Sequence, residues 1–194
     1  ARHCAGRTVL GIKGRDGAFA EFLSLPARNL IELPDSISDD LAVFVEPLAA
    51  ACNILEQIQI SRSTHVAVVG DGKLAQLVVI AIAQTGSPIT VIGRHKEKLE
   101  LARRFGARHT FLESEARLEA TSGPFDVAIE ASGSPSGLTT ALNLVKPKGT
   151  VVLKSTHHDE TRLDMSKVVV NELTIIGSRC GRFQPAIDLL ASGR

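Results

Sequence analysis

The chain has 194 residues, of which 44% are hydrophobic and 22% are charged, and its formal net charge at pH 7 is +1. This composition is typical of a globular protein of one or two domains with a substantial core. The sequence has no Trp or Tyr and no basic stripe that would suit nucleic acid, and its longest apolar run, residues 77–83, is too short to span a membrane.

Residues 1 to about 45 alternate short apolar runs with glycine and proline. The runs at residues 8–12, 18–23 and 30–34 predict short strands of an irregular β-rich region. Residues 36–46 and 47–59 predict two helices that lead into the next region.

From residue 65 to about residue 177, apolar strand-like runs alternate with helical patterns. We expect strands near residues 65–69, 89–93, 109–112, 125–130, 149–153 and 172–177. We expect helices near residues 73–85, 95–105, 135–145 and 164–169, and a last helix at 185–191. This alternation predicts an α/β fold of the Rossmann type, with a doubly wound, six-stranded parallel sheet.

A glycine turn lies between the first expected strand and the helix that follows it. The turn reads Gly70-Asp71-Gly72-Lys73-Leu74, and an alanine follows. The first glycine permits a tight turn, and the second allows backbone to approach a pyrophosphate. The helix N-terminus then offers free N–H groups to the phosphates. We therefore predict a dinucleotide site that includes these five residues.

The end of the second expected strand bears on which dinucleotide is bound. Chains that select NAD usually carry Asp or Glu there, to bind the 2′-hydroxyl of the ribose. Here the sequence reads Gly93-Arg94, and Lys98 follows. Because these cations can pair with a 2′-phosphate, NADP is favoured over NAD. The alternative is that they form only the solvated start of a helix.

Several segments together resemble the medium-chain dehydrogenase/reductase superfamily, in its branch of zinc-type alcohol, sorbitol and threonine dehydrogenases. They are GAFAEFLSLPARNLIELPDSIS, Glu46-Pro47-Leu48, VAVVGDGKLAQL, VIGRHKEKLELARRFGA, DVAIEASGSP and PKGTVVL. The resemblance implies that residues 1–45 are the C-terminal part of a GroES-like catalytic domain. Residues 46–178 would be the dinucleotide-binding domain, and residues 179–194 a hinge and helix that return to the catalytic domain. We accordingly expect a fragment of a longer enzyme.

The resemblance also implies an activity, which is hydride transfer between a nicotinamide cofactor and a small alcohol or carbonyl substrate. Zinc would assist in the full-length protein, which would form a homo-oligomer, a dimer or tetramer, with no nucleic-acid or membrane partner. The three cysteines are odd in number and far apart, which favours a reducing compartment, so we expect a cytoplasmic protein.

The resemblance assigns further residues to the sites. Glu46 would lie at the catalytic zinc, or else be a negative group at a helix N-terminus. Cys4 would be the remnant of a structural zinc lobe, or an ordinary thiol. The positions that would approach the cofactor are Ala131, Ser132, Lys154, Ser155 and Arg179, although Arg179 can also be a surface residue. The acidic and histidine-rich run at residues 157–160 is interpreted as a solvated loop.

Two other functions stay open at this point. One is a zinc-independent quinone or enoyl reductase of the same superfamily, against which the Glu46-Pro47-Leu48 motif weighs. The other is a non-catalytic module that binds a dinucleotide, which fold alone does not exclude.

Overall fold

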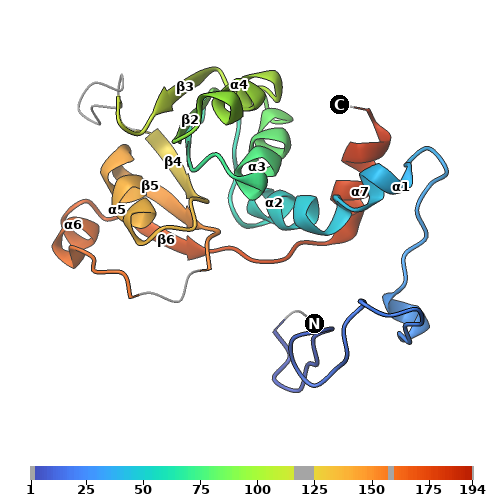
Figure 1. The fold of residues 1–194 in the computed structure, drawn as a ribbon. Coiled ribbons are helices and arrows are strands. Elements are labelled where there is room, and N and C mark those ends of the chain that lie inside the picture. Colours follow the sequence, from blue (N-terminus) through green and yellow to red (C-terminus); the bar gives the residue numbers. More distant parts are fainter. Residues whose placement is uncertain (1–2, 116–124, 157–159, 194) are drawn as a thin grey trace.

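The computed structural model describes residues 3–115, 125–156 and 160–193. Its centre is a six-stranded sheet in the order β3-β2-β1-β4-β5-β6, and all neighbouring strands run parallel (Figure 1). The strands are β1 (Val66–Val69), β2 (Ile89–Gly93), β3 (His109–Leu112), β4 (Phe125–Glu130), β5 (Val145–Leu153) and β6 (Thr174–Gly177). This strand order is that of the Rossmann fold, and it confirms the fold class predicted from the sequence.

Helices cover both faces of the sheet, which explains why the central strands are rich in apolar residues. Every residue of β1 and β2 is buried. Because successive side chains of a strand point to opposite faces, Val66 and Val68 join one apolar cluster, whereas Ala67 and Val69 join another.

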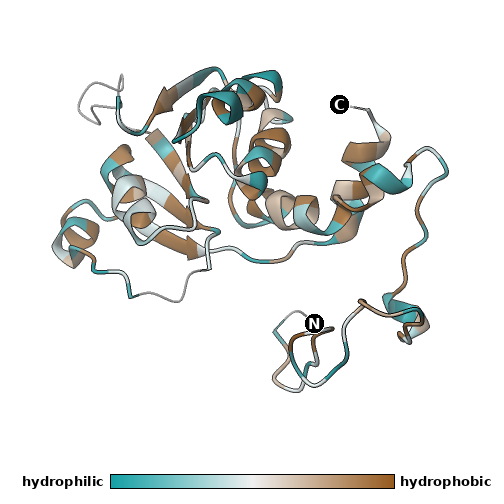
Figure 2. Ribbon diagram, in the orientation of Figure 1, coloured by the Kyte–Doolittle hydropathy of each residue, from teal (hydrophilic) through white to brown (hydrophobic). Residues whose placement is uncertain are grey.

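The first cluster packs against α2 (Val45–Gln57), α3 (Lys73–Ala83), α4 (Lys96–Arg104) and α7 (Phe183–Ala191). The second packs against α5 (Pro135–Leu144) and the partly buried side of α6 (Met165–Val170). In Figure 2 the strands of the sheet are predominantly hydrophobic, whereas α4 is predominantly hydrophilic. No helix in the described part of the chain is long and apolar enough to cross a membrane.

Residues 3–44 form an arm outside the sheet (Figure 1). The start of the arm lines a cavity together with α2 and the chain after β6, and Ile37 near its end packs against Ile187 of α7. The strands predicted at residues 8–12, 18–23 and 30–34 are absent from it, so that prediction was wrong for the described chain. The arm contains one isolated antiparallel bridge between Val9 and Lys13, a 3₁₀ turn at Ala27–Asn29 and the short helix α1 (Asp39–Ala42). Strands need a neighbouring strand to pair their backbone groups, and no such neighbour lies beside these runs among the described residues.

Several predicted boundaries also shift, most of all those of the first helix, which was predicted at residues 36–46 and is α1 (Asp39–Ala42) in the structure. The second helix begins at Val45 rather than at residue 47, because Pro47 is tolerated in a first turn, where its missing N–H is not needed. Strand β5 begins at Val145 rather than at residue 149, directly after α5. Strand β6 begins at Thr174 rather than at residue 172, because Glu172 has a positive φ of 50° and belongs to the turn before it.

Candidate functional site

A pocket of about 220 Å³ lies at the carboxyl ends of β1 and β2, where β4 also ends. The strand order reverses beside β1, and such a crevice is where open α/β sheets bind their ligands. Seven of the predicted site residues line it, namely Gly70, Asp71, Gly72, Gly93, Arg94, Lys98 and Ser132. The lining residues that the sequence analysis missed are Val69, Ile92, His95, Glu113, Ser136 and Gly137.

The glycine turn brings the backbone of β1 against the end of β4. Gly70 has a φ of +118°, and a Cβ there would lie 2.6 Å from the carbonyl oxygen of Ala131. Gly72 differs, because a Cβ there would meet nothing within 4 Å and would instead fill open space beside the pocket. Helix α3 begins directly after it, so Lys73 and Leu74 lie in a first turn whose N–H groups have no partner within the helix.

Asp71 ties this turn to the end of β2. Its Oδ2 accepts hydrogen bonds from the backbone N–H groups of Arg94 (2.6 Å) and His95 (2.7 Å) and lies 3.0 Å from Nδ1 of the His95 ring. Burial opposes ionisation of Asp71, but the N–H groups of His95 and Arg94 and the imidazole outweigh it and lower the pKa of the carboxyl. A Cβ at Gly93 would lie 2.6 Å from Cβ of Asp71, so this contact requires glycine.

The Arg94 side chain forms an ion pair inside the pocket. Its Nε donates to Oε2 of Glu113 at 2.6 Å, and this hydrogen bond raises the pKa of the guanidinium. The sequence analysis did not identify Glu113, which directly follows β3 and whose N–H donates to the carbonyl of Gly93. Lys98 lines the same pocket, and in the described part of the chain no carboxylate lies within ion-pair distance of its amine.

A buried carboxylate, Glu130, organises the end of β4. Its Oε1 accepts hydrogen bonds from the N–H and Oγ of Ser132, at 2.8 and 2.6 Å, and from Oγ of Ser155, at 3.0 Å. Oγ of Ser155 also accepts from the N–H of Gly133 at 2.8 Å. The structure therefore brings Ser132 and Ser155 together, as the prediction of a shared site requires, through a residue that the sequence analysis missed.

Lys154 and Arg179 lie apart from this pocket. Lys154 is buried, and its Nζ donates to the carbonyl oxygens of Ala50 (2.7 Å) and Arg179 (2.8 Å). Burial lowers the pKa of Lys154 to about 8, although electrostatic interactions with Cys180 and Glu46 act to raise it. The side chain of Arg179 is exposed and lines a second cavity of about 240 Å³.

The two predicted zinc residues, Glu46 and Cys4, are both exposed. Within residues 3–115, 125–156 and 160–193, no three His, Cys, Asp or Glu side chains gather as a metal site. Glu46 and Cys4 therefore do not form a zinc site with other described residues. Residues 157–159 of the histidine-rich run lie outside the described chain.

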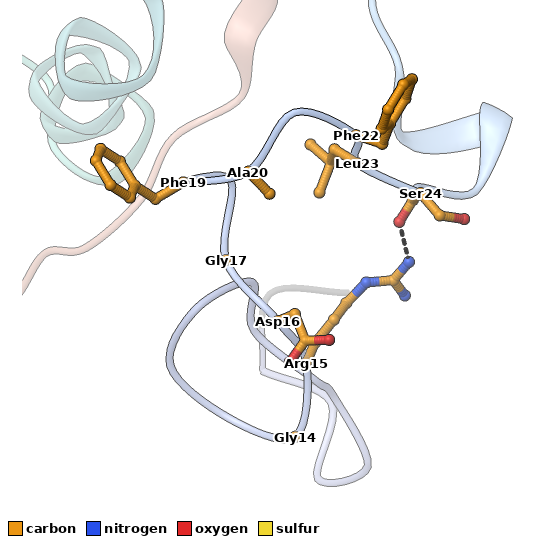
Figure 3. Close-up of a pocket in the computed structure, with 9 residues that line it drawn as sticks. All are labelled: Gly14, Arg15, Asp16, Gly17, Phe19, Ala20, Phe22, Leu23 and Ser24. Atoms are coloured by element: carbon orange, nitrogen blue, oxygen red, sulfur yellow. Dashed lines mark hydrogen bonds between the residues drawn. The ribbon is translucent and has the colours of Figure 1, made fainter.

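A larger cavity, of about 840 Å³, lies in the arm between residues 14 and 24 (Figure 3). There the guanidinium of Arg15 donates to the carbonyl of Ser24, and the rings of Phe19 and Phe22 extend in different directions (Figure 3). Both rings are fully or almost fully exposed, so they do not form an apolar wall. The smaller pocket, which is built on strand ends and a helix N-terminus, is therefore the candidate site.

Comparison with known proteins agrees with this geometry. The family model described as zinc-binding dehydrogenase matches residues 74–192. The L-threonine 3-dehydrogenase of Burkholderia vietnamiensis (strain G4 / LMG 22486) is 33% identical over 184 residues, which cover 91% of this chain and 53% of that protein. The chain thus spans about half the length of the curated relatives that it matches.

Solved structures resemble nearly the whole chain. A protein from Sinorhizobium meliloti 1021, described as a zinc-binding dehydrogenase and solved with NADP, has a TM-score of 0.90 at 27% identity, covering 99% of this chain and 60% of its own. An alcohol dehydrogenase from E. coli CFT073, solved with NADH, has a TM-score of 0.90 at 28% identity, covering 98% of this chain and 58% of its own. Together with the matched residues and the Rossmann strand order, these findings show that the chain belongs to the zinc-binding dehydrogenase family.

Proposed function

We propose that this protein is part of an oxidoreductase that transfers a hydride between a nicotinamide dinucleotide and a small alcohol or carbonyl substrate. The observation that carries the proposal is the pocket at the ends of β1 and β2. It combines a glycine turn, the N-terminus of α3 and the side chains of Arg94 and Lys98. Membership of the zinc-binding dehydrogenase family supports the same activity.

The residues of the pocket fit the adenosine half of a dinucleotide. The open space beside Gly72 would accept the pyrophosphate, and the N–H groups at Lys73 and Leu74 would bind its oxygens. Gly93, Arg94 and Lys98 would surround the adenosine ribose. Because the two cations can bind a 2′-phosphate, we propose that NADP is preferred over NAD.

The nicotinamide half would extend along the end of β4 toward β5. Ala131 and Ser132 would approach it through backbone, and Ser155 would border the ring together with Arg179. Lys154 would fix the backbone of Arg179 beside the nicotinamide, because its Nζ donates a hydrogen bond to the carbonyl oxygen of Arg179. The nicotinamide accepts or donates the hydride when bound, and these residues orient it and exclude water.

Zinc, assembly and compartment belong to the whole protein. We propose that the full-length enzyme binds zinc with Glu46 at or beside the metal, and that it forms a homo-oligomer in the cytoplasm. Residues 1–45 would belong to its catalytic domain, residues 46–178 to its dinucleotide-binding domain, and residues 179–194 to the hinge and returning helix. Because the described residues do not form a zinc site by themselves, we assign no reaction step to zinc.

Cofactor preference is tested by titrating the chain with NADPH and NADH at one fixed ionic strength. We expect tighter binding of NADPH, and we expect Arg94→Gln to weaken NADPH binding about tenfold, since hydrogen bonds to charged groups contribute roughly 1.5–3 kcal/mol. The variant should change NADH binding far less. Position 94 is preferable to position 93, where any side chain would overlap Asp71.

The control is Arg104→Gln, which removes one positive charge from an exposed position of α4 outside the pocket. Equal affinities for the two cofactors in the unaltered chain would contradict the preference for NADP. For the activity, the full-length protein should reduce NADP⁺ when an alcohol is added. A zinc-loaded full-length protein that binds NADPH but shows no turnover with primary, secondary or polyol substrates would contradict the proposed reaction.

A further inference from the structure

We propose that Glu113 determines how strongly the site discriminates NADP from NAD, by holding the Arg94 guanidinium that a 2′-phosphate would need. This inference rests on the proposed dinucleotide site and goes beyond it. It adds a specificity-determining residue directly after β3, outside the glycine turn. The ion pair of Arg94 and Glu113 lies within the pocket lining, with 2.6 Å between Nε and Oε2.

Only the side chain of Arg94 has freedom to change partner. Its backbone N–H is bound by Oδ2 of the buried Asp71, and the carbonyl of the preceding Gly93 accepts from the N–H of Glu113. The side chains of Arg94 and Glu113 are 57% and 38% exposed. The guanidinium can therefore rotate toward a phosphate while the loop below it stays fixed.

Two anions would compete for this one guanidinium. Binding of NADP would break the ion pair between Arg94 and Glu113, because the guanidinium would bind the 2′-phosphate instead. NAD lacks this phosphate and would leave the ion pair intact. A ligand shifts such an equilibrium only by its differential affinity for the two arrangements, so the Arg94–Glu113 pair opposes NADP alone. Lys98 lines the same pocket, and no carboxylate among the described residues pairs with its amine. Lys98 would therefore favour NADP whether or not Arg94 is paired with Glu113.

The pair is partly exposed, which limits the size of the effect. Exposed ion pairs contribute little free energy, so removing the competition should strengthen NADPH binding by about two- to fivefold. Binding of NADH should stay unchanged.

The test is a double-mutant cycle read as the ratio of the dissociation constants for NADH and NADPH. Glu113→Gln should raise this ratio by about two- to fivefold. The same substitution in an Arg94→Gln background should have little effect, since the guanidinium is no longer present to be released. Glu115→Gln, which removes the same charge two residues along the chain and outside the pocket lining, is the matched control and should leave the ratio unchanged.

Three outcomes would overturn the inference. The ratio could stay the same in Glu113→Gln, or it could rise equally in Glu115→Gln, which would show a general charge effect. It could also rise as much without Arg94, in which case Glu113 would act by direct repulsion of the phosphate. These outcomes concern the change in the ratio, whereas the proposed preference for NADP concerns its value in the unaltered chain. The two proposals can therefore fail separately.

Discussion

The arm and the sheet region bury their apolar side chains to very different degrees. In the sheet region, Ile82 and Ile129 are completely buried between strands and helices. In the arm, Ile12 and Phe22 are 83% and 91% exposed although they are equally apolar. Several large apolar side chains of the arm thus lack partners within the described chain, whereas Ile37, near the end of the arm, is buried against Ile187 of α7.

This difference shows where the stability and the site of the chain reside. Each strand of the sheet has a neighbour on at least one side and helices on its faces, so burial and backbone pairing reinforce each other. The arm has one isolated bridge and short helical turns. All residues of the candidate pocket belong to the sheet region. We therefore expect substitutions to affect stability and binding there and to have little effect at the exposed positions of the arm.

The largest effect is expected from truncating a core side chain. Ile82→Ala should lower the free energy of unfolding by roughly 2–5 kcal/mol, because it removes buried methyl groups and leaves a cavity. Phe19→Ala removes a larger side chain from the arm and should change the free energy by less than about 0.5 kcal/mol. Denaturant unfolding of both variants measures the contrast. A loss of similar size for Phe19→Ala would mean that the Phe19 ring packs against other residues in solution.

The two glycines of the turn should separate stability from binding. Gly70→Ala should destabilise the chain by about 1–3 kcal/mol, because its Cβ would overlap the backbone of Ala131 in a left-handed conformation. Gly72→Ala should leave the unfolding midpoint nearly unchanged and weaken dinucleotide binding, since its Cβ meets only open space beside the pocket. Thermal unfolding and NADPH titration on the same samples distinguish the two. Unchanged binding in Gly72→Ala would place the pyrophosphate elsewhere.

The smallest effect is expected from pH, through the buried Lys154. Its pKa is about 8 in the folded chain, against an ordinary value of 10.5, so the unfolded chain binds more protons between these pH values. The cost of burying the ammonium is fully present below pH 8 and is relieved as the pH rises to 10.5. Stability should therefore rise across this interval by on the order of 1 kcal/mol.

Comparison with Lys154→Met isolates this contribution from that of other lysines. The variant should lack the rise in stability that the unaltered chain shows between pH 8 and 10.5. Lys13→Met, at an exposed position of the arm, is the control and should retain the rise. Parallel stability curves for the unaltered chain and Lys154→Met would show that Lys154 is not desolvated in the folded state.

The sequence predicted the sheet region well because its signals are local. Continuous apolar runs such as those of β1 and β2, separated by helical patterns, occur where a strand is buried on both faces, and the glycine turn lies within one stretch of chain. The same kind of apolar run failed to predict structure in the arm. A run such as residues 18–23 carries strand propensity, but it becomes a strand only where another strand lies beside it.

The contacts inside the site could not be predicted from the sequence, because they join residues that lie far apart along the chain. Asp71 and His95 are 24 residues apart, and Arg94 and Glu113 are 19 apart, and each pair meets only because neighbouring strands end at one edge. One feature of the sequence could have identified Glu113. It directly follows the strand expected at residues 109–112, and Gly93 ends the strand expected at residues 89–93, so two adjacent parallel strands would bring these residues close together. Lys154 was predicted at the cofactor, and this stays a prediction. Its Nζ donates to two backbone carbonyls, an arrangement that no spacing in the sequence indicates.

The central claim is that the sheet region binds a nicotinamide dinucleotide at the ends of β1 and β2. Calorimetric titration of the chain with NADPH tests it most directly, with Gly72→Val as the comparison because a larger side chain there would fill the proposed pyrophosphate space. We predict saturable binding with one site per chain in the unaltered protein, and loss of binding without loss of folding in Gly72→Val. Absence of saturable binding in the folded, unaltered chain, or equal binding by the variant, would contradict the account.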